Sequence, residues 1–413
     1  MKGRIKVMNS TKLIRLSTLT LVYKEETTEA AEIIKAALAD KCALTLNEAN
    51  TDSYSGNDAL FVKIDSEYSP RRYTIDVCAE SNSITIVGDD FETLYYGVQR
   101  FVRDLIGENA TVAECSIDSK MLIVSDPCII TYNGKYYLSK FTARANGSNA
   151  VAGYDILTSD NLYDWSEPIH AFTAAECTNP DFDGFDNFWA PEICEYRGKF
   201  YIFATYKSRA TQQRGCAVFR SDKPDGKYEL ITQGHITPPD WSCIDNSLYV
   251  DENGDPWMIF VHEWVSMPDK IGSMCACRMT DDLTDLKGEI TTLFYANDAP
   301  WNHKNPVTDG PFIYRFESGK LAMIWSGCSL NGYCIGVAYS ENGVLGPWVQ
   351  EEALLYTKGI GDYRYGRDGG HGAIFRALDG RLMMSFHGPN KPGTQKALHC
   401  FELDTTGDVL RIK

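Results

Sequence analysis

Five residues able to exchange protons or bind cations recur at comparable places in the C-terminal part of this 413-residue chain. Each lies six to ten residues before the glycine of a turn-like string, in a short polar window beside an apolar segment. They are Asp126, Glu192, Asp245, Asp309 and His371. Each one alone could be a turn-forming or solvated side chain. Their coincidence at five places favours a shared site, where carboxyl groups could donate and accept protons.

The five turn-like strings form a repeat. Their glycines lie 64, 56, 65 and 61 residues apart, and three of them follow Asn or Asp. Asn-Gly and Asp-Gly between apolar segments are typical of tight hairpins, because both central residues tolerate a positive φ. The glycines are Gly134, Gly198, Gly254, Gly319 and Gly380. A β unit of about 60 residues, repeated five times, predicts a mainly β chain with a five-bladed β-propeller of four-stranded blades. A β-sandwich or two smaller β-domains are the alternatives.

In a propeller the first strand of each blade lines the central channel, so the five residues are expected to surround the axis. Carboxylates crowded there repel and desolvate one another without evident structural benefit. Such a ring suits glycoside hydrolysis, which needs one carboxylic acid to protonate the leaving oxygen and one carboxylate to activate water or attack the sugar. Crowding raises one pKa and thereby divides these roles. Nearby tryptophans could stack on sugar faces or pack between blades, namely Trp189, Trp241, Trp264 and Trp301.

The region from about Asp118 to Lys413 resembles the family 43 glycoside hydrolases, which are five-bladed propellers. Ser125-Asp126-Pro127 matches the first-blade segment that carries the general base. The string Ile244-Asp245-Asn246-Ser247 resembles the segment with the aspartate that orients the acid and tunes its pKa. Trp189-Ala-Pro-Glu192 is a characteristic second-blade string. Gly370-His371-Gly372 resembles the fifth-blade segment whose histidine faces the axis, sometimes beside a bound cation.

The resemblance implies an inverting glycosidase that releases α-L-arabinofuranosyl or β-xylosyl units from plant-type oligosaccharides. Its implied substrate-binding residues are Trp189, Glu192, Glu263, Trp264 and His371. No cofactor is required, although an axial calcium ion with His371 as a ligand is a candidate. Two further functions remain open: a propeller that binds carbohydrate without turnover, and a scaffold that uses its rim for protein contacts.

One position departs from the family pattern. The family has Glu-Gly-Pro in the fourth blade, where the glutamate is the general acid, whereas this chain has Asp309-Gly310-Pro311. Aspartate keeps the carboxyl chemistry but shortens the reach by one methylene, about 1.5 Å. Asp309 could be the acid in an adjusted backbone, Glu263 could supply the proton instead, or the site could only bind sugar.

Residues 1–119 alternate helix and strand patterns, unlike residues 120–413, and predict a small α+β domain. Helices are expected around 27–38 and 91–106, and strands around 59–64, 73–77 and 83–87. The string from Ile84 to Phe101 resembles the accessory domain that precedes the catalytic barrel of some hexosaminidases and α-glucuronidases. That resemblance implies no catalysis, and the expected role is to pack against the propeller or to shape the substrate cleft.

The amino-acid composition limits which binding partners and which cellular compartment are expected for this chain. Lys+Arg 40 against Asp+Glu 56 gives a formal charge of −16, which disfavours nucleic acid and anionic membranes as partners and leaves an oligosaccharide as the expected one. The N-terminal residues do not fit a signal peptide. Thirteen dispersed cysteines predict reduced thiols and a cytoplasmic location. The Cys275/Cys277 pair and the histidines (His262, His303, His371 and His387 among them) lack the spacing of a zinc site. The sequence indicates no oligomeric state.

Overall fold

A computed structural model describes residues 12–67, 71–142, 152–302, 305–359, 367–390 and 394–413. It divides into two compact units. The first holds the described residues up to Leu122, and the second consists of Ile123–Lys358 and Arg367–Lys413. No helix in the described ranges is long and apolar enough to cross a bilayer. All thirteen cysteines lie in these ranges, and none of them forms a disulfide.

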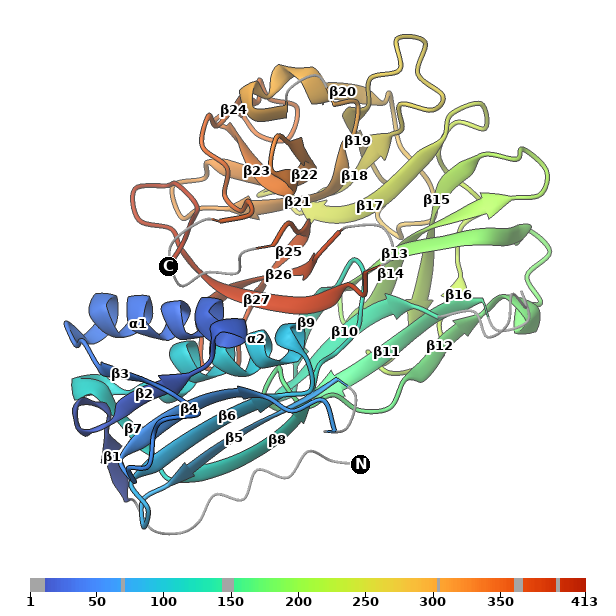
Figure 1. The fold of residues 1–413 in the computed structure, drawn as a ribbon. Coiled ribbons are helices and arrows are strands. Elements are labelled where there is room, and N and C mark those ends of the chain that lie inside the picture. Colours follow the sequence, from blue (N-terminus) through green and yellow to red (C-terminus); the bar gives the residue numbers. More distant parts are fainter. Residues whose placement is uncertain (1–11, 68–70, 143–151, 303–304, 360–366, 391–393) are drawn as a thin grey trace. The chain divides into compact units, whose positions relative to one another are not determined.

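The first unit has an α+β fold, in which two helices pack on one face of a β-sheet (Figure 1). Its six-stranded sheet has the order β3-β2-β4-β6-β5-β8, in which β2, β3, β4 and β6 are parallel and β5 pairs antiparallel with both β6 and β8. A separate β1–β7 pair completes the unit. The strands are β1 (Leu13–Arg15), β2 (Thr20–Tyr23), β3 (Asn47–Asn50), β4 (Ala59–Ile64), β5 (Arg72–Cys78), β6 (Ser83–Gly88), β7 (Thr111–Ala113) and β8 (Cys115–Lys120).

The two helices lie where the sequence predicts them. Helix α1 spans Thr28–Cys42, and α2 spans Phe91–Arg100 with a π-helical turn over Phe101–Leu105. Asp90 caps α2, because its side chain accepts the Thr93 N–H at 2.8 Å. The predicted strands at 59–64, 73–77 and 83–87 correspond to β4, β5 and β6.

The second unit confirms the five-bladed β-propeller. It contains five four-stranded sheets, each antiparallel and each in sequence order, which follow one another from teal to red in Figure 1. Blade 1 is β9 (Cys128–Tyr132), β10 (Lys135–Phe141), β11 (Gly153–Ser159) and β12 (Ile169–Thr173). Blade 2 is β13 (Gly184–Tyr196), β14 (Lys199–Ser208), β15 (Arg214–Ser221) and β16 (Glu229–Leu230). Blade 3 is β17 (Cys243–Val250), β18 (Pro256–His262), β19 (Ser273–Arg278) and β20 (Thr291–Tyr295). Blade 4 is β21 (Asp309–Arg315), β22 (Leu321–Ser329), β23 (Gly332–Ser340) and β24 (Val349–Gln350), and blade 5 is β25 (Gly370–Arg376), β26 (Leu382–Gly388), β27 (Ala397–Asp404) and β28 (Arg411–Ile412).

The repeated glycines occupy the turn between the first and second strand of every blade. All five have positive φ, from 73° at Gly134 to 93° at Gly319. A Cβ added at Gly134, Gly198, Gly254 or Gly380 would meet no atom within 4 Å. These four glycines are therefore required by backbone conformation rather than by crowding.

Apolar side chains between adjacent blades form the core. Large buried aromatics, among them Tyr154, Phe203, Phe219 and Trp325, are almost fully excluded from solvent. Separate clusters join blades 1 and 2, blades 2 and 3, and blades 3 and 4. This packing holds the first strands in place around the axis.

Candidate active site

The first strands of the five blades form a closed ring. Each contacts the first strand of the next blade, and β25 of blade 5 contacts β9 of blade 1. The residues predicted to surround the axis all lie on this ring. Asp126 comes two residues before β9, Asp309 is the first residue of β21, and the other three lie within first strands: Glu192 in β13, Asp245 in β17 and His371 in β25.

In blades 2 to 5 a bulge at the same place redirects these side chains, whereas in blade 1 Asp126 lies just before the first strand. The pairing of the first with the second strand shifts register between Trp189 and Glu192, Ile244 and Ser247, Asp309 and Phe312, and Gly370 and Ala373. A residue with positive φ occurs at each equivalent place: Asp126 (52°), Ala190 (40°), Asp245 (56°), Gly310 (51°) and His371 (56°). Bulges redirect side chains and are frequent beside active sites. Backbone strain of this kind persists only where its surroundings enforce it.

Polar side chains on the second strand of the preceding blade hold two of these strained residues. The Asp245 N–H donates to Thr205 Oγ1 at 3.0 Å, and the His371 N–H donates to Ser326 Oγ at 2.7 Å. Thr205 and Ser326 are fully buried. Each bulge is therefore fixed from the neighbouring blade, so the direction of its side chain depends on how the blades pack.

Asp126 contacts two imidazoles. Its N–H donates to Nδ1 of His387, on β26, at 3.1 Å, and its Oδ1 lies 3.2 Å from the same nitrogen. Nδ1 of His371 lies 3.3 Å from Asp126 Oδ1. Burial raises the pKa of Asp126, but the charge of His371 and the contact with His387 outweigh burial and hold the pKa well below its usual range. Asp126 is therefore ionised at neutral pH.

Asp245 and Asp309 form a coupled pair of carboxyl groups. The N–H of Gly310, the residue after Asp309, donates to Asp245 Oδ2 at 3.0 Å. Burial, followed by repulsion from Asp126, raises the pKa of Asp245 to about 8. Burial, followed by repulsion from Asp245, raises the pKa of Asp309 to about 8. His371 Nδ1 lies 3.7 Å from Asp245 Oδ2 and thus connects Asp245 to Asp126. At least one carboxyl group of the Asp245–Asp309 pair is therefore protonated near neutrality.

Glu192 adds a further carboxyl group to this ring. Burial and the charge of Asp245 raise the pKa of Glu192 well above its usual range. It follows the bulge in β13, three residues after Trp189. Glu192 is thus kept protonated, in which state it can donate a hydrogen bond to a polar ligand.

Glu263 lies among different partners. It follows β18, is only 3% exposed, and accepts hydrogen bonds at Oε2 from Arg214 Nε at 2.6 Å and Ser242 Oγ at 2.8 Å. The Arg214 guanidinium lies 5.1 Å from the ring centre of Trp189. Glu263 and Trp189 are therefore linked through Arg214, which the sequence pattern did not identify.

The tryptophans near the windows have different surroundings. Trp189 is 37% exposed and Trp264 is half-buried. Trp241 stacks on His262 with ring centres 3.9 Å apart. Trp301 is buried and packs against Trp325 at 4.6 Å, so it belongs to the core between blades. Of these four, Trp189 presents the most exposed ring to a ligand.

Two residues beside the carboxyl groups were missed by the sequence pattern. Tyr333, on β23, donates its O–H to Asp309 Oδ2 at 2.9 Å. Its ring stacks on the imidazole of His387, with ring centres 5.8 Å apart. The repeat search followed first strands, whereas Tyr333 lies on a third strand and His387 on a second strand. The one related feature of the sequence is the string Gly369-Gly370-His371-Gly372, whose glycines indicate that other groups pack closely against it.

The sequence names His371 as a candidate ligand of an axial calcium ion. Within the described ranges no group of three or more His, Cys, Asp or Glu side chains is placed to hold a metal ion. Calcium takes six to eight oxygen ligands, whereas His371 offers nitrogen and its Nδ1 faces the carboxylates of Asp126 and Asp245. The steps proposed below therefore use no ion.

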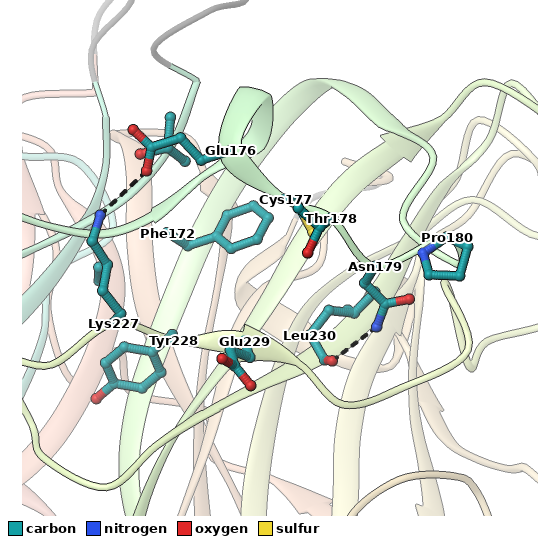
Figure 2. A pocket seen from close by; sticks show the side chains of 12 residues that line it. Phe172, Glu176, Cys177, Thr178, Asn179, Pro180, Lys227, Tyr228, Glu229 and Leu230 are labelled. Atoms are coloured by element: carbon teal, nitrogen blue, oxygen red, sulfur yellow. Dashed lines mark hydrogen bonds and ion pairs between the residues drawn. The ribbon is translucent and has the colours of Figure 1, made fainter.

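A separate cavity of about 520 Å³ lies at the outer strands of blades 1 and 2. Its lining comes from β12, β16 and the residues around them, and includes none of the predicted site residues. Figure 2 shows Lys227 paired with Glu176, and the Asn179 amide paired with the Leu230 carbonyl. Lys227 lies 3.4 Å from Glu176, and the Asn179 amide donates to the Leu230 carbonyl at 3.1 Å.

Comparisons with known proteins agree with this geometry. A profile of the family described as glycosyl hydrolases family 43 matches residues 122–406. An endo-arabinase structure from Bacteroides thetaiotaomicron VPI-5482 is 35% identical, with a TM-score of 0.59 over 69% of this chain and 96% of the other. An endo-1,4-β-xylanase structure from the same organism is 26% identical, with a TM-score of 0.58 over 71% and 95%.

A curated relative gives a similar result. An extracellular exo-α-(1→5)-L-arabinofuranosidase of Cellvibrio japonicus is 25% identical over 184 residues, which are 42% of this chain and 48% of that protein. The match thus spans about half the length of that relative. The family profile begins at the residue before the second unit and ends within the last blade, between β27 and β28, and the chain belongs to glycosyl hydrolases family 43.

Proposed function

We propose that this chain hydrolyses glycosidic bonds with inversion at the anomeric carbon. The observation that carries the proposal is the grouping of Asp126 and Asp245 around His371, with Asp245 bonded to the backbone next to Asp309, which moves the pKa values of Asp126 and Asp309 in opposite directions. The pKa of Asp126 lies below its usual range, and that of Asp309 is raised to about 8. At pH 7 the first group is ionised and the second holds a proton. An inverting glycosidase needs one carboxyl group in each state.

In the proposed reaction, Asp126 removes a proton from a water molecule as the water oxygen attacks the anomeric carbon. The bond from that carbon to the leaving oxygen breaks, and the leaving oxygen keeps the electron pair. Asp309 gives its proton to this oxygen. The products are a free sugar and an alcohol, and proton exchange with solvent restores Asp126 and Asp309.

Asp245 is proposed to orient the acid and to keep it protonated. Its hydrogen bond from the Gly310 N–H ties its carboxyl group to the backbone next to Asp309. Its charge contributes to the raised pKa of Asp309. Because the pKa values of both carboxyl groups are raised to about 8, the charge that appears on one of them when it loses its proton favours the protonated form of the other.

Glu263 is proposed to support binding rather than to donate the proton. Its Oε2 accepts hydrogen bonds from both Arg214 and Ser242, so this oxygen is occupied by contacts within the protein. We propose that Glu263 holds Arg214 in place and that Arg214 in turn positions the exposed ring of Trp189 for the substrate. Trp189 would then stack on a sugar face, with Glu192 and Trp264 as further proposed binding residues.

The proposed substrates are short oligosaccharides with α-L-arabinofuranosyl units, and α-1,5 linkages are to be tested first. The endo-arabinase of 35% identity and the exo-α-(1→5)-L-arabinofuranosidase support this choice. β-Xylosyl units are the second substrate class, supported by the xylanase of 26% identity.

A propeller that binds carbohydrate without turnover is the second candidate function. The observation in its favour is Asp309 itself, which is one methylene shorter than the family's glutamate. That difference is about 1.5 Å, and misplacement of a reacting group by about 1 Å can lower the rate about 100-fold.

Hydrolysis assays on the purified chain distinguish these functions. Parent and Asp309→Ala proteins are compared on α-1,5-arabino-oligosaccharides, β-1,4-xylo-oligosaccharides and nitrophenyl pentosides, and NMR identifies the first-formed anomer. We expect Asp309→Ala to slow oligosaccharide cleavage by roughly 100- to 10,000-fold and nitrophenyl cleavage far less, because a good leaving group needs little protonation. A product that retains the substrate's configuration contradicts inversion. Sugar binding without hydrolysis by the parent establishes the binding propeller.

A further inference from the structure

We propose that Tyr333 is a positioning residue that fixes the Asp309 carboxyl group and places its acidic proton on Oδ1. This inference rests on the proposed function, in which Asp309 is the acid. Tyr333 donates its O–H to Asp309 Oδ2 at 2.9 Å. In a neutral carboxyl group one oxygen carries the proton and the other accepts hydrogen bonds. The oxygen that accepts from Tyr333 is therefore the carbonyl oxygen, which leaves Oδ1 to deliver the proton to the leaving group.

Tyr333 keeps the proton that this role requires. Burial, and then the charge of Asp309, raise the pKa of the Tyr333 phenol well above its usual range. The phenol is thus neutral throughout the range in which Asp309 titrates. Its hydroxyl acts as a donor in both protonation states of the acid, and its hydrogen bond favours the ionised state.

The ring of Tyr333 is itself held in place. It is 5% exposed and stacks on His387, which contacts Asp126. Its backbone N–H donates to Asp368 Oδ2 at 3.4 Å. On a further side lies Gly370, where an added Cβ would come within 2.4 Å of the Tyr333 ring. A residue larger than glycine at position 370 would displace the ring, so the string before His371 leaves room for Tyr333.

The groups that face Asp309 come from several elements. Asp245 on β17, His371 on β25 and Asp126 before β9 act on it through their charges, and Tyr333 on β23 acts through its hydrogen bond. Replacing the Tyr333 hydroxyl would leave all three charges in place. The effect of the hydrogen bond can therefore be measured separately from that of the charges.

The test is Tyr333→Phe, which keeps the ring and removes only the hydroxyl. Tyr228→Phe is the matched control, since Tyr228 is also buried and its O–H donates to the Pro224 carbonyl at 3.0 Å, in blade 2. For Tyr333→Phe we expect kcat/KM on oligosaccharides to fall about 10- to 100-fold, with a much smaller loss on nitrophenyl pentosides. The basic limb of the pH–rate profile should move to higher pH, because a bond that favours ionised Asp309 is lost. Tyr228→Phe should change neither quantity.

A direct measurement separates this inference from the proposed function. Carbon NMR of the carboxyl groups, assigned with Asp309→Asn, should show a higher pKa for Asp309 in Tyr333→Phe than in the parent. An unchanged pKa, or equal losses on both leaving groups, overturns the role of Tyr333 while the proposed function stands. A parent protein that hydrolyses no glycoside overturns the proposed function, and the role of Tyr333 with it, whatever the NMR titration gives.

Discussion

Arg214 Nε donates to Glu263 Oε2 at 2.6 Å and thereby joins the start of β15 in blade 2 to the end of β18 in blade 3. Glu263 is 3% exposed, whereas Trp189, against which the guanidinium lies, is 37% exposed. A buried carboxylate thus sets the place of an exposed aromatic ring through one arginine. This arrangement supports the proposal that Glu263 acts in binding and that an axial carboxyl group donates the proton.

We predict that Glu263→Gln raises KM for oligosaccharides by about tenfold and leaves the ratio of oligosaccharide to nitrophenyl kcat nearly unchanged. The amide still accepts a hydrogen bond but no longer pairs with the Arg214 charge, so Trp189 loses its support. Glu263→Ala leaves the arginine charge unpaired and should lower the free energy of unfolding by about 3–5 kcal/mol in urea titrations. A loss confined to poor leaving groups in Glu263→Gln would instead identify Glu263 as the proton donor.

The blades could be predicted from the sequence because the turn that marks each one is a local feature. The five repeated glycines, which are Gly134, Gly198, Gly254, Gly319 and Gly380, all adopt positive φ, a conformation that favours glycine and so marks each turn in the sequence. The same spacing led to Asp126, Asp245 and His371, since each stands eight or nine residues before such a glycine. Strands β4, β5 and β6 could likewise be predicted from the alternation of apolar and polar residues along them.

The contacts that set the chemistry could not be predicted in this way. Tyr333 and Asp309 are 24 residues apart and meet only because β23 is the third strand of the blade that β21 begins. His387 reaches Asp126 across 261 residues, through closure of the ring between blades 5 and 1. Such contacts depend on how the blades pack against one another. This packing produces no regular spacing of residues in the sequence. The proposal that Asp309 rather than Glu263 is the acid likewise rests on the contact of Arg214 with Glu263, which the sequence does not display.

Asp126→Asn should reduce hydrolysis by roughly 100- to 10,000-fold without unfolding the chain, because an amide cannot take the proton of the attacking water. Asparagine also tolerates the positive φ of 52° at this position. Steady-state kinetics and the thermal unfolding midpoint of parent and variant give the comparison. Retention of more than about a tenth of the parent's activity would remove Asp126 from the base role.

The pH dependence follows from the two displaced pKa values. Activity requires ionised Asp126 and protonated Asp309, so it should fall on the acid side only below the ordinary aspartate range and on the basic side near pH 8. Asp245→Asn removes a negative charge that raises the pKa of Asp309. Its basic limb should therefore move to lower pH in profiles of kcat/KM. A shift to higher pH, or none, would contradict the proposed coupling of Asp245 to the acid.

Asp309→Glu, which introduces the family's usual residue, should lower activity rather than raise it. The Tyr333 hydroxyl lies 2.9 Å from Asp309 Oδ2, and the ring behind it is confined by His387 and by the backbone at Gly370. An added methylene moves the carboxyl group by about 1.5 Å into this fixed partner or away from it, and a misplacement of this size can lower the rate about 100-fold. Tyr333→Phe removes the hydroxyl, so the double variant should recover part of the loss, and its kcat/KM on oligosaccharides should exceed the product of the two single effects. Strictly multiplicative losses would show that Tyr333 does not determine which carboxylic acid fits this site.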